Sequence, residues 1–136
     1  MAIPIGIRRL SALRRAGSDI AELMAEPEPS ALLHKICAFA NDIRNAGGGY
    51  IVLGAEPGPE THDIRISGIA PDSADAMLRM VSEISRLIIP FYEPKAETMI
   101  HEGKCIIVLR CKGGRGRPYT APEDAEAPES GRRFYI

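Results

Sequence analysis

The sequence contains no tryptophan and few other aromatic residues, which together make up 5% of the chain. Proteins that bind single-stranded nucleic acid without sequence preference stack successive bases on aromatic side chains. The four tyrosines, at positions 50, 92, 119 and 135, are too dispersed to indicate such a platform. The composition therefore disfavours a single-strand binder that depends on base stacking.

Cysteine is also scarce, with three residues and no CxxC pair. An odd and sparse set argues against a disulfide framework and against a zinc site. Cys105 and Cys111 would distort a single strand if they paired with each other. We therefore expect Cys37, Cys105 and Cys111 to be reduced and mostly buried thiols, as is typical of a cytoplasmic protein.

Long apolar runs and recognisable ligand sets are missing as well. No run approaches the roughly 20 residues that a membrane span needs, so we expect no membrane partner. The N-terminal stretch MAIPIGIRRL lacks the apolar core of a secretory signal. His34, His62 and His101 are scattered without metal-ligand spacing, and no Ser-His-Asp or Cys-His arrangement stands out. The sequence therefore predicts no metal and no cofactor.

Neither sign of charge dominates, because 17 basic and 18 acidic residues leave a net charge of −1. This balance gives no global attraction for nucleic acid. The charges are nevertheless clustered, with acids at residues 22–28 and again at 123–129. Two basic groups stand out, and we take their members as candidate phosphate contacts: Arg110, Lys112, Arg115 and Arg117, and, nearer the N-terminus, Arg8, Arg9, Arg14 and Arg15.

A helical pattern followed by glycines is the most informative feature that is present. We expect a helix that begins at residues 29–30 with Ser30 as its N-cap. Asn41 ends the pattern, and we interpret it as a C-terminal cap or a local backbone bond. The glycines then let the chain reverse closely into a buried strand at residues 50–53, so we treat Asn41, Gly47, Gly48 and Gly49 as a structural hinge. The expected buried stripe of the helix is Leu32, Leu33, Ile36, Cys37 and Ala40, widened by Phe39 and Ile43.

The other elements follow in a mixed order. Before residue 30 we expect a short basic helix at 7–13 and a helical turn that ends at Met24, capped by Ser18 or Asp19. After the hinge we expect a strand at 63–67, a helix capped by Asp72 or Ser73, a hairpin with arms at 95–100 and 105–111, a mobile acidic segment at 120–130 and a last strand at 132–136. This order predicts a single α+β domain in which helices flank a mixed β-sheet. We place a helical and acidic lead-in at residues 1–29 and the domain itself at 30–136.

Seven short blocks of the chain resemble the Schlafen-type AlbA_2 domain. They appear in family order, as AFAN (38–41), GGGYIVLG (47–54), ISGIAP (66–71), IIP (88–90), GKCIIVLR (103–110), RPY (117–119) and FYI (134–136). The resemblance implies a DNA-binding module of a bacterial or archaeal transcriptional regulator. Family members run on beyond the last block, so a C-terminal regulatory or ATPase-like part is expected. Residues 113–116 lack the Gly-Lys-Ser/Thr end of a P-loop, so ATP binding is not expected of this chain.

One departure from the family bears on catalysis. The family usually opens with Glu-Ser, three residues and Glu-Phe-Lys, and the aligned stretch here is GSDIAELM, residues 17–24. In the Schlafen branch, paired glutamates here and an acid after the glycine-ended strand are associated with RNA cleavage. Glu22 and Glu56 match two of these positions, but Gly17 replaces the first glutamate. Metal-assisted cleavage needs several carboxylates, so the departure disfavours a nuclease and leaves Glu22 and Glu56 as weak candidates.

Three hypotheses on function follow. The first is a non-enzymatic nucleic-acid-binding module, with DNA or else RNA as partner, in which arginine side chains on a glycine-rich loop bind phosphates. The second is a metal-dependent ribonuclease, degenerate or active. The third is a protein-interaction or homodimerisation module that uses the edge of the hairpin. The plainest alternative for the glycine-rich basic residues at 110–117 is a solvated surface, neutralised by the acidic segment at 123–129.

Overall fold

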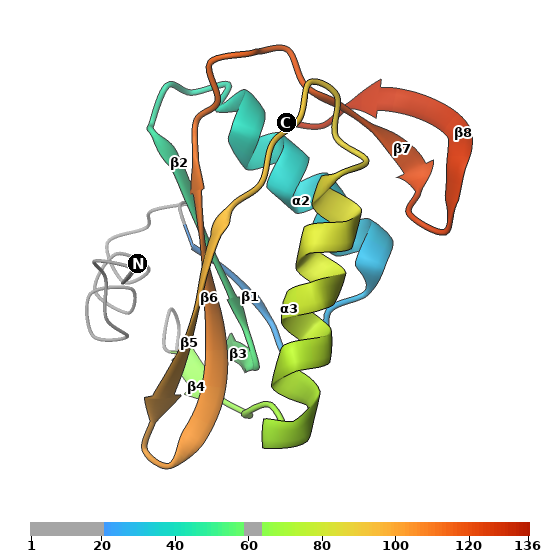
Figure 1. Cartoon of the computed structure of the whole chain (residues 1–136). Coiled ribbons are helices and arrows are strands. Elements are labelled where there is room, and N and C mark those ends of the chain that lie inside the picture. The colour runs from blue at the N-terminus through green and yellow to red at the C-terminus, as the bar shows by residue number, and fades with distance from the viewer. Residues whose placement is uncertain (1–20, 59–63) are drawn as a thin grey trace.

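A mixed four-stranded sheet forms the centre of the fold. The computed structural model describes residues 21–58 and 64–136. The strands of the sheet are β1 (Ala21–Met24), β2 (Gly48–Leu53), β6 (Lys104–Lys112) and β5 (Lys95–His101), in that spatial order (Figure 1). β1 runs parallel to β2, and the other neighbouring pairs are antiparallel. The prediction of an α+β fold with a mixed sheet is confirmed.

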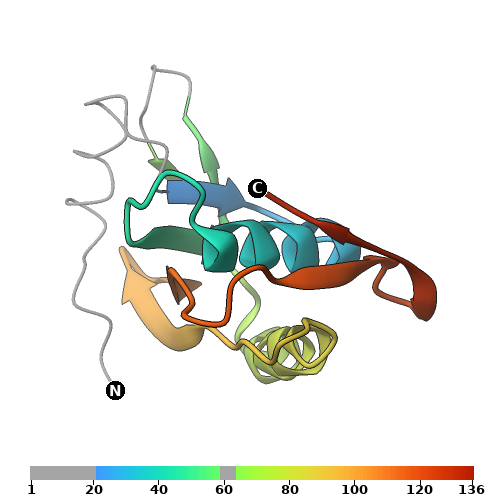
Figure 2. The same ribbon diagram turned by 90° about the horizontal axis from the view of Figure 1, so that it is seen from above.

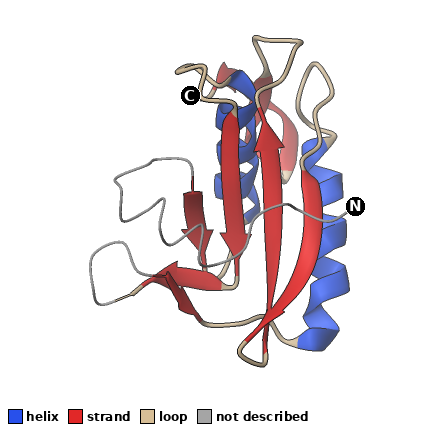
Figure 3. Cartoon of the chain, turned by 90° about the vertical axis from the view of Figure 1, so that its left-hand side faces the viewer, coloured by secondary structure: helices blue, strands red, loops and turns tan. Residues whose placement is uncertain are grey.

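Two helices of the described chain, α2 (Pro29–Asn41) and α3 (Pro71–Ser85), lie on the same face of this sheet (Figure 3). The residues of the predicted stripe of α2 are fully buried against Ile51 and Leu53 of β2 and Leu109 of β6. The opposite face carries a second cluster, which includes Tyr50, Val52 and the hairpin of β3 (Ala55–Pro57) and β4 (Ile64–Ile66). β2 is thus buried on both faces, which explains its continuous apolar run.

The helix boundaries differ from expectation at the caps. Glu28, not Ser30, is the N-cap of α2, and its carboxylate accepts hydrogen bonds from the backbone amides of Ser30 and Ala31. The hydroxyl of Ser30 instead accepts a hydrogen bond from the amide of Ala125, 95 residues away. Ile43 lies beyond the end of α2 and is 65% exposed, so it does not widen the buried stripe.

Helix α3 also begins earlier than predicted. Ala70 occupies its N-cap position, and no side chain caps the helix. Pro71 stands at the first helical turn, where its lack of an amide hydrogen costs nothing and its φ angle suits a helix. The caps expected at Asp72 and Ser73 are therefore wrong, and both residues lie inside the helix.

The helical turn predicted to end at Met24 is wrong. Ala21–Met24 is strand β1, and its residues pair with Tyr50–Leu53 of β2. Leu23 packs in the second hydrophobic cluster while Met24 packs against the first, so the side chains alternate between the two faces of the sheet. Four residues are too few to distinguish the two-residue alternation of a strand from a helical turn by sequence alone. The expected basic helix at residues 7–13 lies outside the described residues.

The acidic segment predicted to be mobile is also ordered. β7 (Thr120–Asp124) and β8 (Ala127–Phe134) form an antiparallel hairpin that lies alongside α2 (Figure 2). Pro122 is tolerated there because the hairpin is a separate two-stranded sheet with a register irregularity beside this residue. The last strand is consequently longer than the predicted 132–136 and begins before it.

All three cysteines are buried and free of disulfides, as predicted. Burial raises the pKa of the Cys111 thiol, and it does the same for the pKa of Cys37. Buried thiols of this kind are inert rather than nucleophilic. Within the described residues no helix is both long and apolar enough to cross a bilayer.

Candidate functional site

Three connections that are distant in sequence meet at one end of the molecule (Figure 1). They are residues 41–47 after α2, residues 86–94 after α3 and residues 112–119 after β6, and we refer to this region as the loop end. The amide of Gly114 donates to the carbonyl of Ala40 at 2.8 Å, and the hydroxyl of Tyr92 donates to the carbonyl of Lys112 at 2.6 Å. The loop end contains Lys112, Arg115 and Arg117, three of the four members of one predicted basic group, and Arg110 precedes it in β6.

Asn41 joins α2 to the segment at residues 112–119 and to Tyr135, which follows β8. Its side-chain amide donates to the carbonyls of Tyr119 at 3.0 Å and of Tyr135 at 2.9 Å. Its side-chain oxygen accepts a hydrogen bond from the amide of Tyr119 at 2.7 Å. The interpretation of Asn41 as a local cap is therefore wrong, because the backbone groups that its side chain bonds are 78 and 94 residues away. Asp42 occupies the C-cap position instead, with a left-handed backbone.

Backbone conformation favours glycine at positions 47 and 48, and close packing requires it at Gly48. Gly47 and Gly48 have φ angles of 90° and 92°, a region that favours glycine. A Cβ on Gly48 would collide with the backbone carbonyl of Cys111 on the neighbouring strand. Gly49 is the second residue of β2 and lies opposite Cys111 of β6. These contacts explain how the chain turns from a buried helix directly into a buried strand.

Asp42 organises the turn between α2 and β2. Its carboxylate accepts hydrogen bonds from the amides of Ala46 at 2.8 Å and Gly47 at 2.9 Å. Burial acts to raise the pKa of Asp42, but these amides, that of Gly48 and the nearby Arg117 guanidinium outweigh it, so the pKa lies below its usual value. The carboxylate of Asp42 is thus engaged by the amides of the turn itself.

Arg117 binds the C-terminal end of α2. Its Nη1 donates to the carbonyls of Asn41 at 3.4 Å and Asp42 at 3.3 Å, and to the side-chain oxygen of Asn45 at 3.2 Å. A cation is favourable at this position because the carbonyls at a helix C-terminus carry partial negative charge. Arg117 therefore fastens the basic loop to the helix.

The glycines of the basic loop, residues 113–117, serve packing as well. A Cβ on Gly114 would collide with the ring of Tyr119, and one on Gly113 would lie 2.9 Å from the Cβ of Asp42. Their amides are also used internally, since Gly113 donates to the carbonyl of Gly47 and Gly116 donates to the hydroxyl of Tyr119. The loop consequently offers a ligand its side chains rather than a cradle of free backbone amides.

The four cations of this predicted group have different surroundings. The guanidinium of Arg110 lies 4.8 Å from the centre of the Tyr50 ring, on the sheet face opposite the helices, where a cation–π contact holds it. Lys112 and Arg115 are exposed. Within residues 21–58 and 64–136, neither of these two side chains has a hydrogen bond or an ion pair. Arg8, Arg9, Arg14 and Arg15, the second predicted group, lie outside the described residues.

The acidic segment does not neutralise the basic loop through any described contact. Glu123 pairs with Arg133 of the same hairpin at 3.6 Å. The carboxylate of Asp124 accepts a hydrogen bond from the amide of Glu126, within the turn between β7 and β8. The acids at these positions therefore serve the hairpin in which they lie.

The two glutamates considered for catalysis are each beside a cation. Glu22 of β1 pairs with Lys35 of α2 at 3.4 Å, and Glu56 of β3 pairs with Arg65 of β4 at 3.8 Å. Among the residues that the structure describes, no group of three or more His, Cys, Asp or Glu side chains is placed to hold a metal ion. Residues 21–58 and 64–136 thus supply no set of carboxylates through which a metal-dependent cleavage can be derived.

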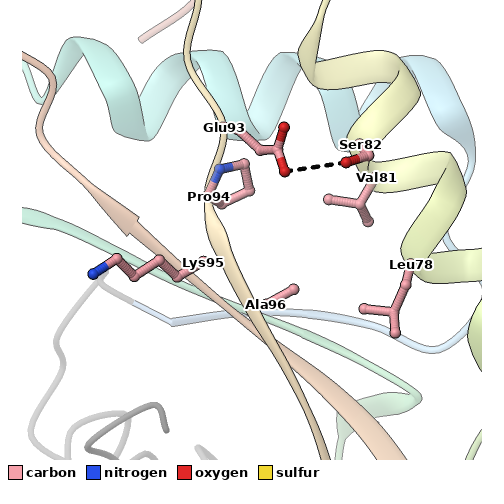
Figure 4. Close-up of a pocket in the computed structure, with 7 residues that line it drawn as sticks. All are labelled: Leu78, Val81, Ser82, Glu93, Pro94, Lys95 and Ala96. Carbon is pink, nitrogen blue, oxygen red and sulfur yellow. Dashed lines mark hydrogen bonds between the residues drawn. The ribbon is translucent and has the colours of Figure 1, made fainter. Parts of the chain in front are cut away.

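A shallow groove of about 450 Å³ lies between α3 and the start of β5 (Figure 4). The hydroxyl of Ser82 donates to the carboxylate of Glu93 at 3.0 Å across it. None of the residues predicted for a site lines this groove, whose walls are Leu78, Val81, Ser82, Glu93, Pro94, Lys95 and Ala96. The loop end is therefore the better candidate site.

Sequence reasoning missed the residues that support the loop end. Tyr92 and Tyr119 meet edge to face with ring centres 5.5 Å apart, and burial raises the pKa of Tyr92. Tyr119 belongs to the RPY block, and this block was the one sequence signal that pointed to it. Its central position depends on hydrogen bonds with Asn41, which cannot be read from the order of residues along the chain. Tyr135, from the last block, stacks on His34 with ring centres 3.9 Å apart.

Comparison with known proteins bears on the family and the fold. Residues 18–136 match the family described as Schlafen, AlbA_2. No curated protein sequence matches the chain. The fold is similar to the solution NMR structure of the N-terminal domain of a protein from Nitrosomonas europaea, whose name relates it to the ATP-dependent DNA helicase RecG. The TM-score is 0.65 at 18% identity, over 97% of this chain and 89% of that chain. The chain belongs to the Schlafen AlbA_2 family, which confirms the resemblance seen in the sequence.

Proposed function

We propose that this domain binds nucleic acid through the phosphate backbone, with the side chains of Lys112 and Arg115 as direct contacts. The observation that carries the proposal is that both cations are exposed, Lys112 at the end of β6 and Arg115 on the basic loop that follows it. Asn41, Arg117 and Tyr119 fix the backbone of this region. A fixed backbone lowers the entropy that is lost when side chains are ordered on a ligand. An arginine fork and a lysine ammonium both bond phosphate oxygens strongly.

The other two cations of the group have supporting roles in this proposal. Arg117 is a positioning residue, because its guanidinium already bonds three oxygens at the end of α2. Arg110 lies against Tyr50 and adds to the positive potential without leaving the sheet face. We therefore assign two direct contacts and two supporting residues within a group of four cations that looks uniform in sequence.

DNA is the partner that the family favours, and RNA is the alternative. The similar domain from Nitrosomonas europaea belongs to a protein named after a DNA helicase, which supports a module that delivers nucleic acid to a larger protein, here a transcriptional regulator. Two phosphate contacts predict a weak affinity for duplex DNA. The logarithm of the binding constant should fall with the logarithm of the salt concentration with a slope of about −1.8. Backbone contacts of this kind position a protein without reading sequence.

Fluorescence anisotropy with labelled duplex DNA, single-stranded DNA and RNA at two ionic strengths tests the proposal. We expect binding that weakens as salt rises and varies little between unrelated sequences. Absence of binding to all three polyanions at low salt would refute the proposed function.

A further inference from the structure

An exposed apolar segment lies beside the two cations at the loop end. Ile89 is 54% exposed and Phe91 is 65% exposed, and Pro90 between them is exposed as well. The composition led us to expect no stacking platform made of tyrosines. A single phenylalanine beside a cationic loop is a different arrangement, because it serves one base rather than a row of bases.

The residues on both sides of Phe91 are held, through the backbone of Ile89 and the side chains of Pro90 and Tyr92. Ile89 exchanges two backbone hydrogen bonds with Thr120, at 2.9 and 3.0 Å. A Cβ on Gly116 would lie 3.3 Å from the ring of Pro90, so this proline packs against the basic loop. On the other side, the hydroxyl of Tyr92 bonds the carbonyl of Lys112. Phe91 is thus an exposed ring on a fixed backbone, next to the segment that carries Lys112 and Arg115.

We propose that Phe91 stacks on an unpaired base while Lys112 and Arg115 bond the adjoining phosphates, so that the ligand class of the loop end is single-stranded nucleic acid. This inference rests on the proposed function and adds the strand state to it. A duplex hides the faces of its bases in the stack, whereas a single strand exposes them to an aromatic ring. Fixed backbone on both sides of the ring keeps the entropic cost of stacking low.

The same chemistry, an exposed aromatic ring near cations, also suits an anionic membrane surface. The positions of the anchors favour the nucleic acid. The cations lie on the segment that contacts the two neighbours of Phe91, so the ring and the cations adjoin each other as a base adjoins its own phosphates. Binding to vesicles is therefore an outcome of the test and not part of the proposal.

The test compares wild type, Phe91→Ala and Phe91→Trp, with Ile100→Ala as control. Ile100 is 69% exposed in β5, whose end and turn lie away from the loop end, so its truncation removes a similar apolar side chain elsewhere (Figure 1). Affinities are measured by anisotropy for a thymine oligonucleotide, a hairpin duplex and vesicles of phosphatidylglycerol. We expect Phe91→Ala to weaken single-strand binding about tenfold, with duplex affinity unchanged and Phe91→Trp at or above wild type.

The outcomes separate this inference from the proposed function. Equal losses on single strand and duplex, no loss on either, or a loss confined to vesicles would overturn the role of Phe91. If the nucleic acids still bind and Arg115→Glu still weakens their binding, the proposed function survives the failure of the inference about Phe91. If wild type binds no nucleic acid, both proposals fail together.

Discussion

The side chain of Asn41 bonds both backbone groups of Tyr119, accepting from its amide at 2.7 Å and donating to its carbonyl at 3.0 Å. This pairing resembles one rung of a β-ladder in which a side-chain amide replaces a peptide group. It fastens the C-terminal end of α2 to the segment that follows the basic loop. The shape of the candidate site depends on this contact between residues that are 78 positions apart.

Asn41→Asp is expected to lower the free energy of unfolding by about 3 kcal/mol. The substitution keeps the size of the side chain but turns its donor nitrogen into an oxygen that faces the carbonyls of Tyr119 and Tyr135. Asn45→Asp is the matched control, because Asn45 is exposed and its acceptor for Arg117 is retained. Urea unfolding of the two variants measures the difference. Equal stability of both would contradict the central role of Asn41.

Gly114→Ala is expected to destabilise the domain by about 2 kcal/mol, because the new Cβ would collide with the ring of Tyr119. Gly131→Ala adds the same atom where no other atom lies within 4 Å. Thermal unfolding of the pair tests the packing of the basic loop. A similar melting temperature for the two variants would show that residues 113–117 do not pack on Tyr119.

The turn at Asp42 gives a prediction about pH. The pKa of Asp42 is lowered in the fold, so its contribution to stability is present above the ordinary carboxyl value of about 3.9 and is lost as the pH falls through the lower folded-state value. Asp42→Asn should therefore be less stable than wild type at pH 7, by about 1 kcal/mol for this exposed group. The gap should shrink toward pH 2. A gap that stays constant across urea unfolding at pH 7, 4 and 2 would argue against the charged turn.

The parts of the fold with strong periodic patterns could be predicted from the sequence. The stripe from Leu32 to Ala40 predicts α2, and the apolar run at 105–111 predicts the central strand β6, because burial alone determines both patterns. β1 was missed because four residues carry too short a pattern and their partner strand lies more than 20 positions later. The β7–β8 hairpin was missed because Pro122 and the acids around it resemble a disordered segment, while its stability comes from packing on α2.

The candidate site was predictable as a group of residues but not as an arrangement. Charge clustering was enough to find Lys112, Arg115 and Arg117. It could not distinguish the cation that bonds a helix end from the two that remain exposed, since that depends on the position of Asn45 and the α2 carbonyls. Phe91 carried no signal in sequence, because its exposure is a property of the packed loop end.

The most direct measurement of the central claim is the salt dependence of DNA binding for Arg115→Glu and Lys112→Glu beside Lys104→Glu. Lys104 and Lys112 begin and end the same strand, about 25 Å apart, so the control makes the same charge change at the far end of β6. The account predicts weaker binding and a slope reduced by about 0.9 for each of the first two variants, with the slope of Lys104→Glu unchanged. Equal effects of all three reversals, or none, would contradict the claim that the loop end contacts phosphates.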